Sequence, residues 1–196
     1  MNLKLITAAT IEPVSLTEAK AHLRVTSTDE DTLIDIIIKA ARQSAESMTR
    51  RSLASQVFEL SLDDFPEEEI VLPMPPVESI TSIKYKDSDG VETTWDSSKY
   101  VFYNSEPAKI IPVYGEVFPS FTPYPAGAVK IRFTAGYKTS GTDISLIIPE
   151  AIKQALLLLI GSFYENREDL LSKGHIPKSL PFGVDALLYP YRIWGW

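Results

Sequence analysis

Histidine and cysteine, the side chains that most often catalyse reactions or bind transition metals, are scarce in this chain. Its 196 residues contain no cysteine and two histidines, His22 and His175. A catalytic nucleophile needs a neighbouring base, and the sequence places no serine or orienting acid beside either histidine. Neither histidine is followed by a second metal ligand three or four residues later. The absence of cysteine excludes disulfides and thiolate metal sites.

Carboxylates are the other candidate catalytic groups. Asp63-Asp64 and Glu67 to Glu69 lie in one acidic segment that we interpret as a solvated loop. The glycine-rich patterns that cradle phosphate groups are missing from the sequence. The sequence therefore predicts a protein that is not an enzyme and has no cofactor and no metal site.

The segment FYENRED, Phe163 to Asp169, combines an aromatic ring, an amide and a base. One interpretation is a helix end with a solvated, charged face. The other is an interface with a second protein through Tyr164, Asn166 and Arg167, because tyrosine and arginine are enriched in interface hot spots. Both interpretations remain open at this point.

The C-terminal segment is apolar, aromatic and nearly free of acid. Its prolines, Pro177, Pro181 and Pro190, predict an extended path rather than a helix. The segment either packs back on its own domain or docks into another subunit. The residues predicted to dock are Leu187, Leu188, Tyr189, Tyr191, Arg192, Ile193, Trp194 and Trp196.

Composition and charge limit the class of protein. Hydrophobic residues make up 44% of the chain, enough for a buried core, and the formal net charge is −7. Nucleic-acid binders carry basic patches that contact phosphates, so the bulk charge argues against capture of DNA. The apolar run Ala155–Gly161 is far shorter than the roughly 20 residues that span a bilayer. We expect no membrane association and no secretory signal.

Helices are predicted at both ends of the chain. Ser15 and Glu18 form a capping box that starts a short helix ending near Arg24. A second helix covers Thr28 to Arg51, with Ser27, Thr28 or Asp29 as its cap. Its predicted buried face is Leu33, Ile36, Ile37, Ala40, Ala41, Ser44, Ala45 and Met48. A third helix starts at Pro149 and reaches Asn166 or beyond.

The sequence pattern in the middle of the chain predicts strands and turns. The best hairpin candidate has Ile83 and Tyr85 before an Asp89-Gly90 turn, with Thr93 and Trp95 after it. The order predicts an α+β fold in which a mostly antiparallel β insertion interrupts a helical body. The predicted parts are residues 1–54 (N-terminal helices), 55–145 (β insertion), 146–173 (long helix) and 174–196 (extended docking arm).

Several segments, in this order and spacing, resemble the head–tail connector (adaptor) proteins of tailed bacteriophages and prophages, in the subgroup with a β insertion. The first is PVSLTEAKAHLRV, with Leu16, Glu18, Ala19, Lys20 and Leu23, followed by acids at Asp29 to Asp31 and a long helix ending at Arg50 or Arg51. The others are LPMPPVESITSIKYKDSDG, VKIRFTAGY, IPEAIKQALLLLIGSFYENRE and LPFGVDALLYPYR. The last four residues, IWGW, depart from the pattern.

The resemblance implies a structural virion protein at the head–tail junction, present in the host cytoplasm during assembly. Its implied partners are the portal protein, a stopper or tail-completion protein, and further copies in a dodecameric ring. DNA would pass through the lumen without sequence-specific binding. Two alternatives remain: another neck component, such as a stopper or tail terminator, or a ligand-binding module that uses Trp95, Tyr100 and Tyr103 of the β insertion.

Overall fold

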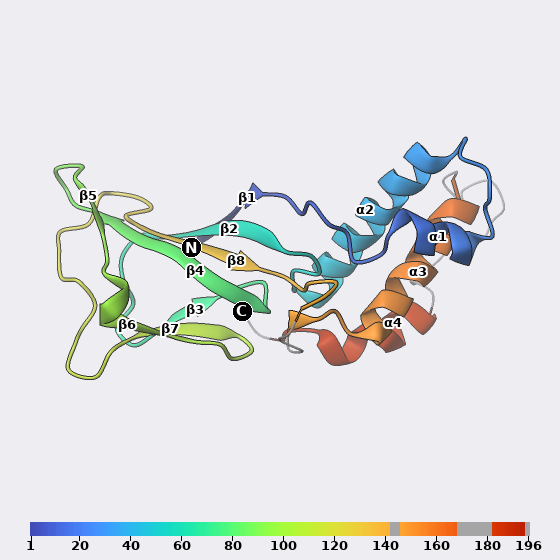
Figure 1. Ribbon diagram of the computed structural model, residues 1–196. Coiled ribbons are helices and arrows are strands. Elements are labelled where there is room, and N and C mark those ends of the chain that lie inside the picture. Colours follow the sequence, from blue (N-terminus) through green and yellow to red (C-terminus); the bar gives the residue numbers. More distant parts are fainter. Residues whose placement is uncertain (142–145, 168–181, 195–196) are drawn as a thin grey trace, which may run out of the picture. The chain divides into compact units, whose positions relative to one another are not determined.

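The computed structural model describes residues 1–141, 146–167 and 182–194 (Figure 1). The chain divides into two compact units. The β unit comprises Met1–Thr10 and Ala54–Tyr137, and the helical unit comprises Ile11–Leu53 and Lys138–Trp196. The predicted α+β class is therefore confirmed.

Two antiparallel sheets make up the β unit (Figure 1). The first has the strand order β1 (Asn2–Thr7), β2 (Gln56–Leu62), β8 (Val129–Ala135), β4 (Val77–Lys86) and β5 (Glu92–Thr94). The second has the order β3 (Ile70–Leu72), β7 (Ala108–Pro112) and β6 (Tyr100–Tyr103), and the short 3-10 helix η1 (Ser97–Lys99) precedes β6. The predicted hairpin is the β4–β5 pair, in which Lys86 lies opposite Glu92.

Alternation along the strands builds the core of the β unit. Phe58 and Leu60 of β2 are buried, as are Ile131 and Phe133 of β8. Residues between them point to the other face, since successive side chains of a strand alternate. The two phenylalanine rings stack with centroids 5.8 Å apart. The second sheet adds Ile110 of β7 to the same cluster.

Gly136 has a backbone conformation that other residues rarely adopt. Its φ is +126°, and a Cβ at this position would lie 1.9 Å from the carbonyl oxygen of Ala54. Its N–H donates to the carbonyl of Pro76 at 2.8 Å. Glycine is required here by both the dihedral angle and the close backbone approach.

The helical unit contains α1 (Leu16–Leu23), α2 (Asp31–Thr49), α3 (Glu150–Glu165), α4 (Phe182–Leu188) and the 3-10 helix η4 (Tyr189–Tyr191). The capping box is confirmed, because Ser15 Oγ accepts from the Glu18 N–H at 3.2 Å and Glu18 accepts from the Ser15 N–H at 2.8 Å. The predicted caps of α2 are wrong. Its N-cap is Glu30, which makes no side-chain capping bond.

The buried face of α2 differs from the predicted one. Ile36 is 58% exposed and Ala40 is exposed, whereas Arg42, Glu46 and Thr49 are buried. The observed buried set is Ile34, Ile37, Ile38, Ala41, Arg42, Ala45, Glu46 and Thr49. The prediction used hydrophobicity alone and therefore placed the buried face incorrectly. Two of the buried positions hold the charged residues Arg42 and Glu46, which pair with each other.

Two further differences concern the chain ends. Asn2–Thr7, placed with the helices in the sequence-based division, pairs with β2 in the β unit. The prediction of an extended C-terminal path is wrong for Phe182–Tyr191, which form α4 and η4. Pro190 is compatible with this turn because it lies at the start of η4, where no helical N–H bond is required.

Candidate interface sites

The described residues contain no group of three or more His, Cys, Asp or Glu side chains arranged to hold a metal ion. His22 lies beside α3, where a Cβ on Gly161 would come within 3.4 Å of its Nε2. His175 lies outside the described residues. No helix in the part of the chain that the structure describes has both the length and the apolar character of a membrane span.

The acidic segment of the β unit is a surface loop, as predicted. Asp63, Asp64, Glu67 and Glu68 are exposed. Asp63 accepts from the Gly127 N–H at 2.9 Å. This exposure agrees with the solvated loop expected from the sequence.

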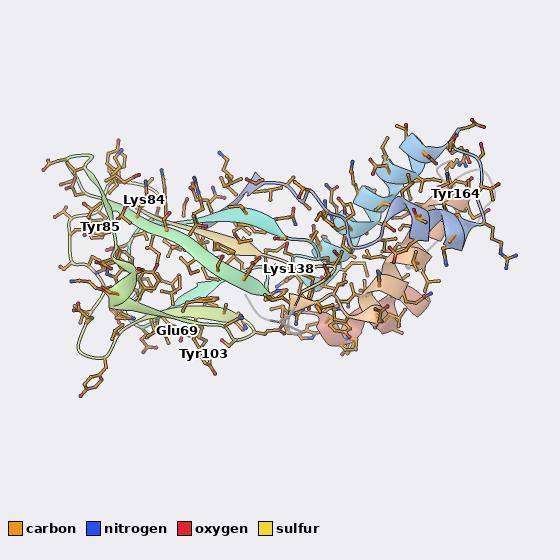
Figure 2. The ribbon with its side chains drawn as sticks, in the orientation of Figure 1. Glu69, Lys84, Tyr85, Tyr103, Lys138 and Tyr164 are labelled. Carbon is orange, nitrogen blue, oxygen red and sulfur yellow. The ribbon has the colours of Figure 1, made fainter. Side chains whose placement is uncertain are left out.

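The C-terminal end of α3 contacts the residue that precedes α2. Tyr164 Oη donates a short hydrogen bond to Glu30, whose other carboxylate oxygen lies 2.8 Å from the Arg167 guanidinium. The Arg167 guanidinium also stacks over the Tyr164 ring at 4.4 Å. Figure 2 labels Tyr164 at the end of α3. Tyr164 and Arg167 thus have partners within their own unit.

Glu30, Tyr164 and Arg167 form what we call the Glu30 cluster, in which the hydrogen bonds stabilise the charged form of Glu30. The pKa of Glu30 is lowered, first by the hydrogen bond from Tyr164 and then by that from Arg167. The pKa of Tyr164 is raised, chiefly because its proton is held by Glu30. Asn166 donates to the Ser162 carbonyl at 2.9 Å and so closes the last turn of α3.

The opposite end of α3 is tied to α1. Lys153 Nζ lies 2.6 Å from Glu18, the capping-box carboxylate. The pKa of Glu18 falls to about 2, first because of the Lys153 hydrogen bond and then because of the backbone N–H of Ser15. The side chain of Glu18 is 44% exposed, so solvent screens much of this attraction.

A buried charged cluster supports α2. Arg42 contacts Glu12 and Glu46, both at 2.7 Å, and its side chain is 6% exposed. Glu46 also accepts from the Leu53 N–H at 2.9 Å. Burial raises the pKa of Glu46, and the positive charge of Arg42 opposes this. The partners are needed because an unpaired charge at this depth would be costly.

Residues 182–194 of the C-terminal segment pack back on their own unit. Val184 and Leu188 of α4 are fully buried. The Ile193 N–H donates to the Thr49 carbonyl at 3.0 Å, and Arg51 Nε donates to the Tyr191 carbonyl at 2.5 Å. Of the predicted docking residues, Leu188 is buried and Leu187, Tyr191, Arg192 and Ile193 are half-buried. Trp196 lies outside the described residues.

Two aromatic side chains of this segment remain in solvent. Tyr189 is 55% exposed and Trp194 is 68% exposed. Their rings meet edge to face with centroids 5.7 Å apart. The bonds at Tyr191 and Ile193 tie the backbone between these two residues to the helical unit, and we call Tyr189 and Trp194 the aromatic pair. An exposed aromatic pair is the kind of anchor that protein interfaces use.

Aromatic residues of the β unit serve mainly as core. Trp95 is 5% exposed, and its ring lies 5.0 Å from Tyr100 and 5.6 Å from Phe65. Tyr103, labelled in Figure 2, is 58% exposed. The ligand-binding alternative loses its basis, because two of its three aromatic residues pack inward.

Sequence reasoning missed the residues that receive these contacts. In the sequence, Glu30 stood out only as one of the acids at Asp29 to Asp31, and Arg50 and Arg51 only as the end of the long helix. The structure separates the two arginines: Arg50 is the exposed, left-handed C-cap of α2, and Arg51 is 5% exposed. Thr49 contributes its backbone carbonyl, which no side-chain pattern identifies.

The fold and these contacts can be compared with known proteins. A family model described as "Head completion protein" matches residues 12–192. A chain in the "Neck of empty GTA particle computed with C6 symmetry" is 29% identical with a TM-score of 0.78, over 98% of this chain and 95% of that chain.

Two further structures agree. A chain in the "Virion of native gene transfer agent (GTA) particle" is 30% identical with a TM-score of 0.76, and one in the "Neck of native GTA particle computed with C12 symmetry" is 28% identical with a TM-score of 0.75. Each covers 98% of this chain and 95% of that chain. No curated protein matches the chain. Because the family model spans both structural units, the chain belongs to the head completion protein family.

Proposed function

We propose that this protein is a structural subunit of the virion neck, an adaptor ring that joins the capsid portal to the stopper and tail. The observation that carries the proposal is the similarity over 98% of the chain to a neck protein of a phage-like particle. Those necks were computed with sixfold and twelvefold symmetry, which supports a ring and agrees with a dodecamer. The role requires no catalysis.

The aromatic pair is the proposed docking element. Tyr189 and Trp194 leave apolar surface in water at a fixed place, and burial in a partner would remove that cost. We assign the partner as the portal protein or the adjacent adaptor. Tyr164, Asn166 and Arg167, in contrast, act first as internal ties of the helical unit, and any contact they make with a partner must preserve the Glu30 cluster.

Charge fits passage of DNA rather than its capture. The net charge of −7 repels phosphates, so a duplex in the proposed lumen would slide rather than bind.

The first experiment measures mass by light scattering for the purified chain alone and with its portal. We expect a ring-sized species, free or bound to the portal. A strict monomer that ignores the portal would remove the proposal.

The docking element is tested in the same assay with the Y189S/W194S double variant. Tyr114→Ser is the matched control, because Tyr114 is a fully exposed tyrosine of the β unit. The double variant should lose portal binding or ring formation, while the control retains both. A double variant that binds the portal and forms the ring normally would contradict the assigned role of the aromatic pair.

A further inference from the structure

The outer face of the five-stranded sheet carries a charge opposite to that of its unit. The β unit has seven Lys and Arg residues against thirteen Asp and Glu, a net charge of −6. The cross-strand register nevertheless brings five of the seven basic residues together on one face with two glutamates. We call this set the basic face: Lys4, Lys84, Lys86, Lys130 and Arg132, with Glu59 and Glu92.

The register places these side chains in adjacent rows. Lys4 lies opposite Glu59, which lies opposite Arg132. In the next row Lys130 lies opposite Lys84, and beyond it Lys86 lies opposite Glu92. A shallow pocket is lined by Glu59, Ser82, Lys84, Glu92, Lys130 and Arg132. The basic face is therefore one continuous surface across the five strands of the sheet.

One pairing on the basic face is unfavourable. Like charges directly opposite each other on neighbouring strands destabilise a sheet. Lys84 and Lys130 hold such positions. Glu92 contacts Lys84 at 2.8 Å, but Lys130 has no ion pair within the described residues. An anionic partner would offset this repulsion.

The same unit carries a matching anionic segment, the acidic loop Asp63–Glu69. Asp64, Glu67 and Glu68 are exposed and form no ion pair among the described residues. The loop is anchored by Phe65, whose ring contacts Tyr85, Trp95, Phe118 and Phe121 at centroid distances of 5.3–6.0 Å. The carboxylates are thus presented from a fixed backbone, which lowers the entropy lost on binding.

The two surfaces do not face the same way. Glu69 leads into β3 of the second sheet, whereas Lys84 belongs to β4 of the first. Figure 2 shows Glu69 and Lys84 on opposite sides of the β unit. Complementary patches on different sides of one molecule join copies head to tail, and such contacts form a ring when the rotation from copy to copy closes.

We propose that the acidic loop of one copy binds the basic face of the next copy around a ring. The inference rests on the proposed function, because it names the contact that would hold neighbouring adaptor subunits together. A second copy is favoured over DNA as the partner. The chain itself carries a matching acidic surface, the loop Asp63–Glu69, so no anion from outside the ring is needed to complement the basic face.

The test uses the full chain and two charge-reversed variants, K84E/K130E for the basic face and E67K/E68K for the acidic loop. A carbodiimide couples a lysine amine directly to a carboxylate, so mass spectrometry of a mixture of isotope-labelled and unlabelled chains identifies contacts between copies. The charge-matched control is K39E/K99E, since both lysines are about half exposed and lie outside the basic face.

We expect cross-links from Lys84 or Lys130 to Glu67 or Glu68 of another copy at about 0.1 M salt, and their loss at about 1 M, where charges are screened within roughly 3 Å. In each charge-reversed variant alone, the yield of these cross-links should fall at least about tenfold, because like charges would face each other between copies. An equimolar mixture of the two should regain association, since alternating copies restore opposite charges at every contact. The control should behave as the wild type.

Three results would overturn the inference: no such cross-links in the wild type, no effect of either reversal, or wild-type binding of duplex DNA that K84E/K130E abolishes while cross-linking is unchanged. Binding to the portal separates this inference from the proposed function. If the wild type binds the portal but shows no such cross-links, only the inference is wrong. If the wild type shows the cross-links but does not bind the portal, the proposed function is wrong.

Discussion

The helical unit has two sites with exposed aromatic or arginine side chains, and only one of them has a partner inside the unit. At the end of α3, Tyr164 and Arg167 converge on Glu30. After α4, Tyr189 and Trp194 contact each other and otherwise face solvent. The residue types common in interface hot spots therefore do not reveal whether their partner lies in the same unit or in another protein. The availability of a carboxylate on the neighbouring helix start decides it.

The largest effect should come from the buried residue that precedes the aromatic pair in the chain. Leu188→Ala removes a fully buried side chain of α4 and should lower the free energy of unfolding by about 2–5 kcal/mol. Chemical denaturation measures this change. A loss below about 0.5 kcal/mol would mean that the C-terminal segment is not part of the folded helical unit.

The ion pair at the first turn of α3 gives a smaller, pH-dependent effect. Glu18→Gln keeps a capping-box side chain but removes the charge next to Lys153, and should cost at most about 1 kcal/mol at pH 7. The folded-state pKa of Glu18 is about 2, below its ordinary 4.5. The stabilisation is therefore complete above pH 4.5 and is lost as the pH falls toward 2. Denaturation across this range should show the wild type and the variant converging at acid pH; a constant difference would contradict the assignment.

The Glu30 cluster should respond more weakly. Tyr164→Phe removes the hydrogen bond to Glu30 but keeps the ring under Arg167, so the melting temperature should fall slightly. Because the bond also lowers the pKa of Glu30, carboxylate NMR should show that pKa rising in the variant. An unchanged pKa would indicate that Arg167 alone holds the carboxylate.

The smallest effect on stability should come from the aromatic pair itself. The Y189S/W194S variant removes two exposed side chains and should stay within about 0.5 kcal/mol of the wild type. The double variant is expected to affect binding to the partner rather than folding. A large loss of stability would turn the pair from a docking element into a structural one and remove the contrast between the two sites.

The sequence predicted those parts of the fold that depend on local chemistry. Ser15 and Glu18 lie three residues apart, and Asp89-Gly90 separates two alternating runs, so both the capping box and the hairpin were identifiable. The resemblance to connector proteins also predicted the family. What failed depended on contacts distant in sequence, such as the β1–β2 pairing and the Arg42 cluster that turns α2.

The candidate site was predicted less well for the same reason. Tyr189 and Trp194 were identified by composition, but nothing local showed that Leu188 beside them is buried. The helix Phe182–Leu188 was missed because the surrounding prolines favoured an extended path. Pro181 and Pro190 flank that helix rather than interrupt it.

The pairing of Gln56 with Ala135 has a consequence for how this architecture tolerates change in length. The first residue of β2 and the last of β8 are cross-strand partners, so the long segment between them starts and finishes about 5 Å apart. Residues gained or lost at a distant hairpin, such as Asp87–Val91, leave that short span unaltered. For the helical unit, the segment 54–137 is therefore a loop whose two ends stay paired whatever its length. The surface of this segment can diversify without a change in the helical residues that precede and follow it.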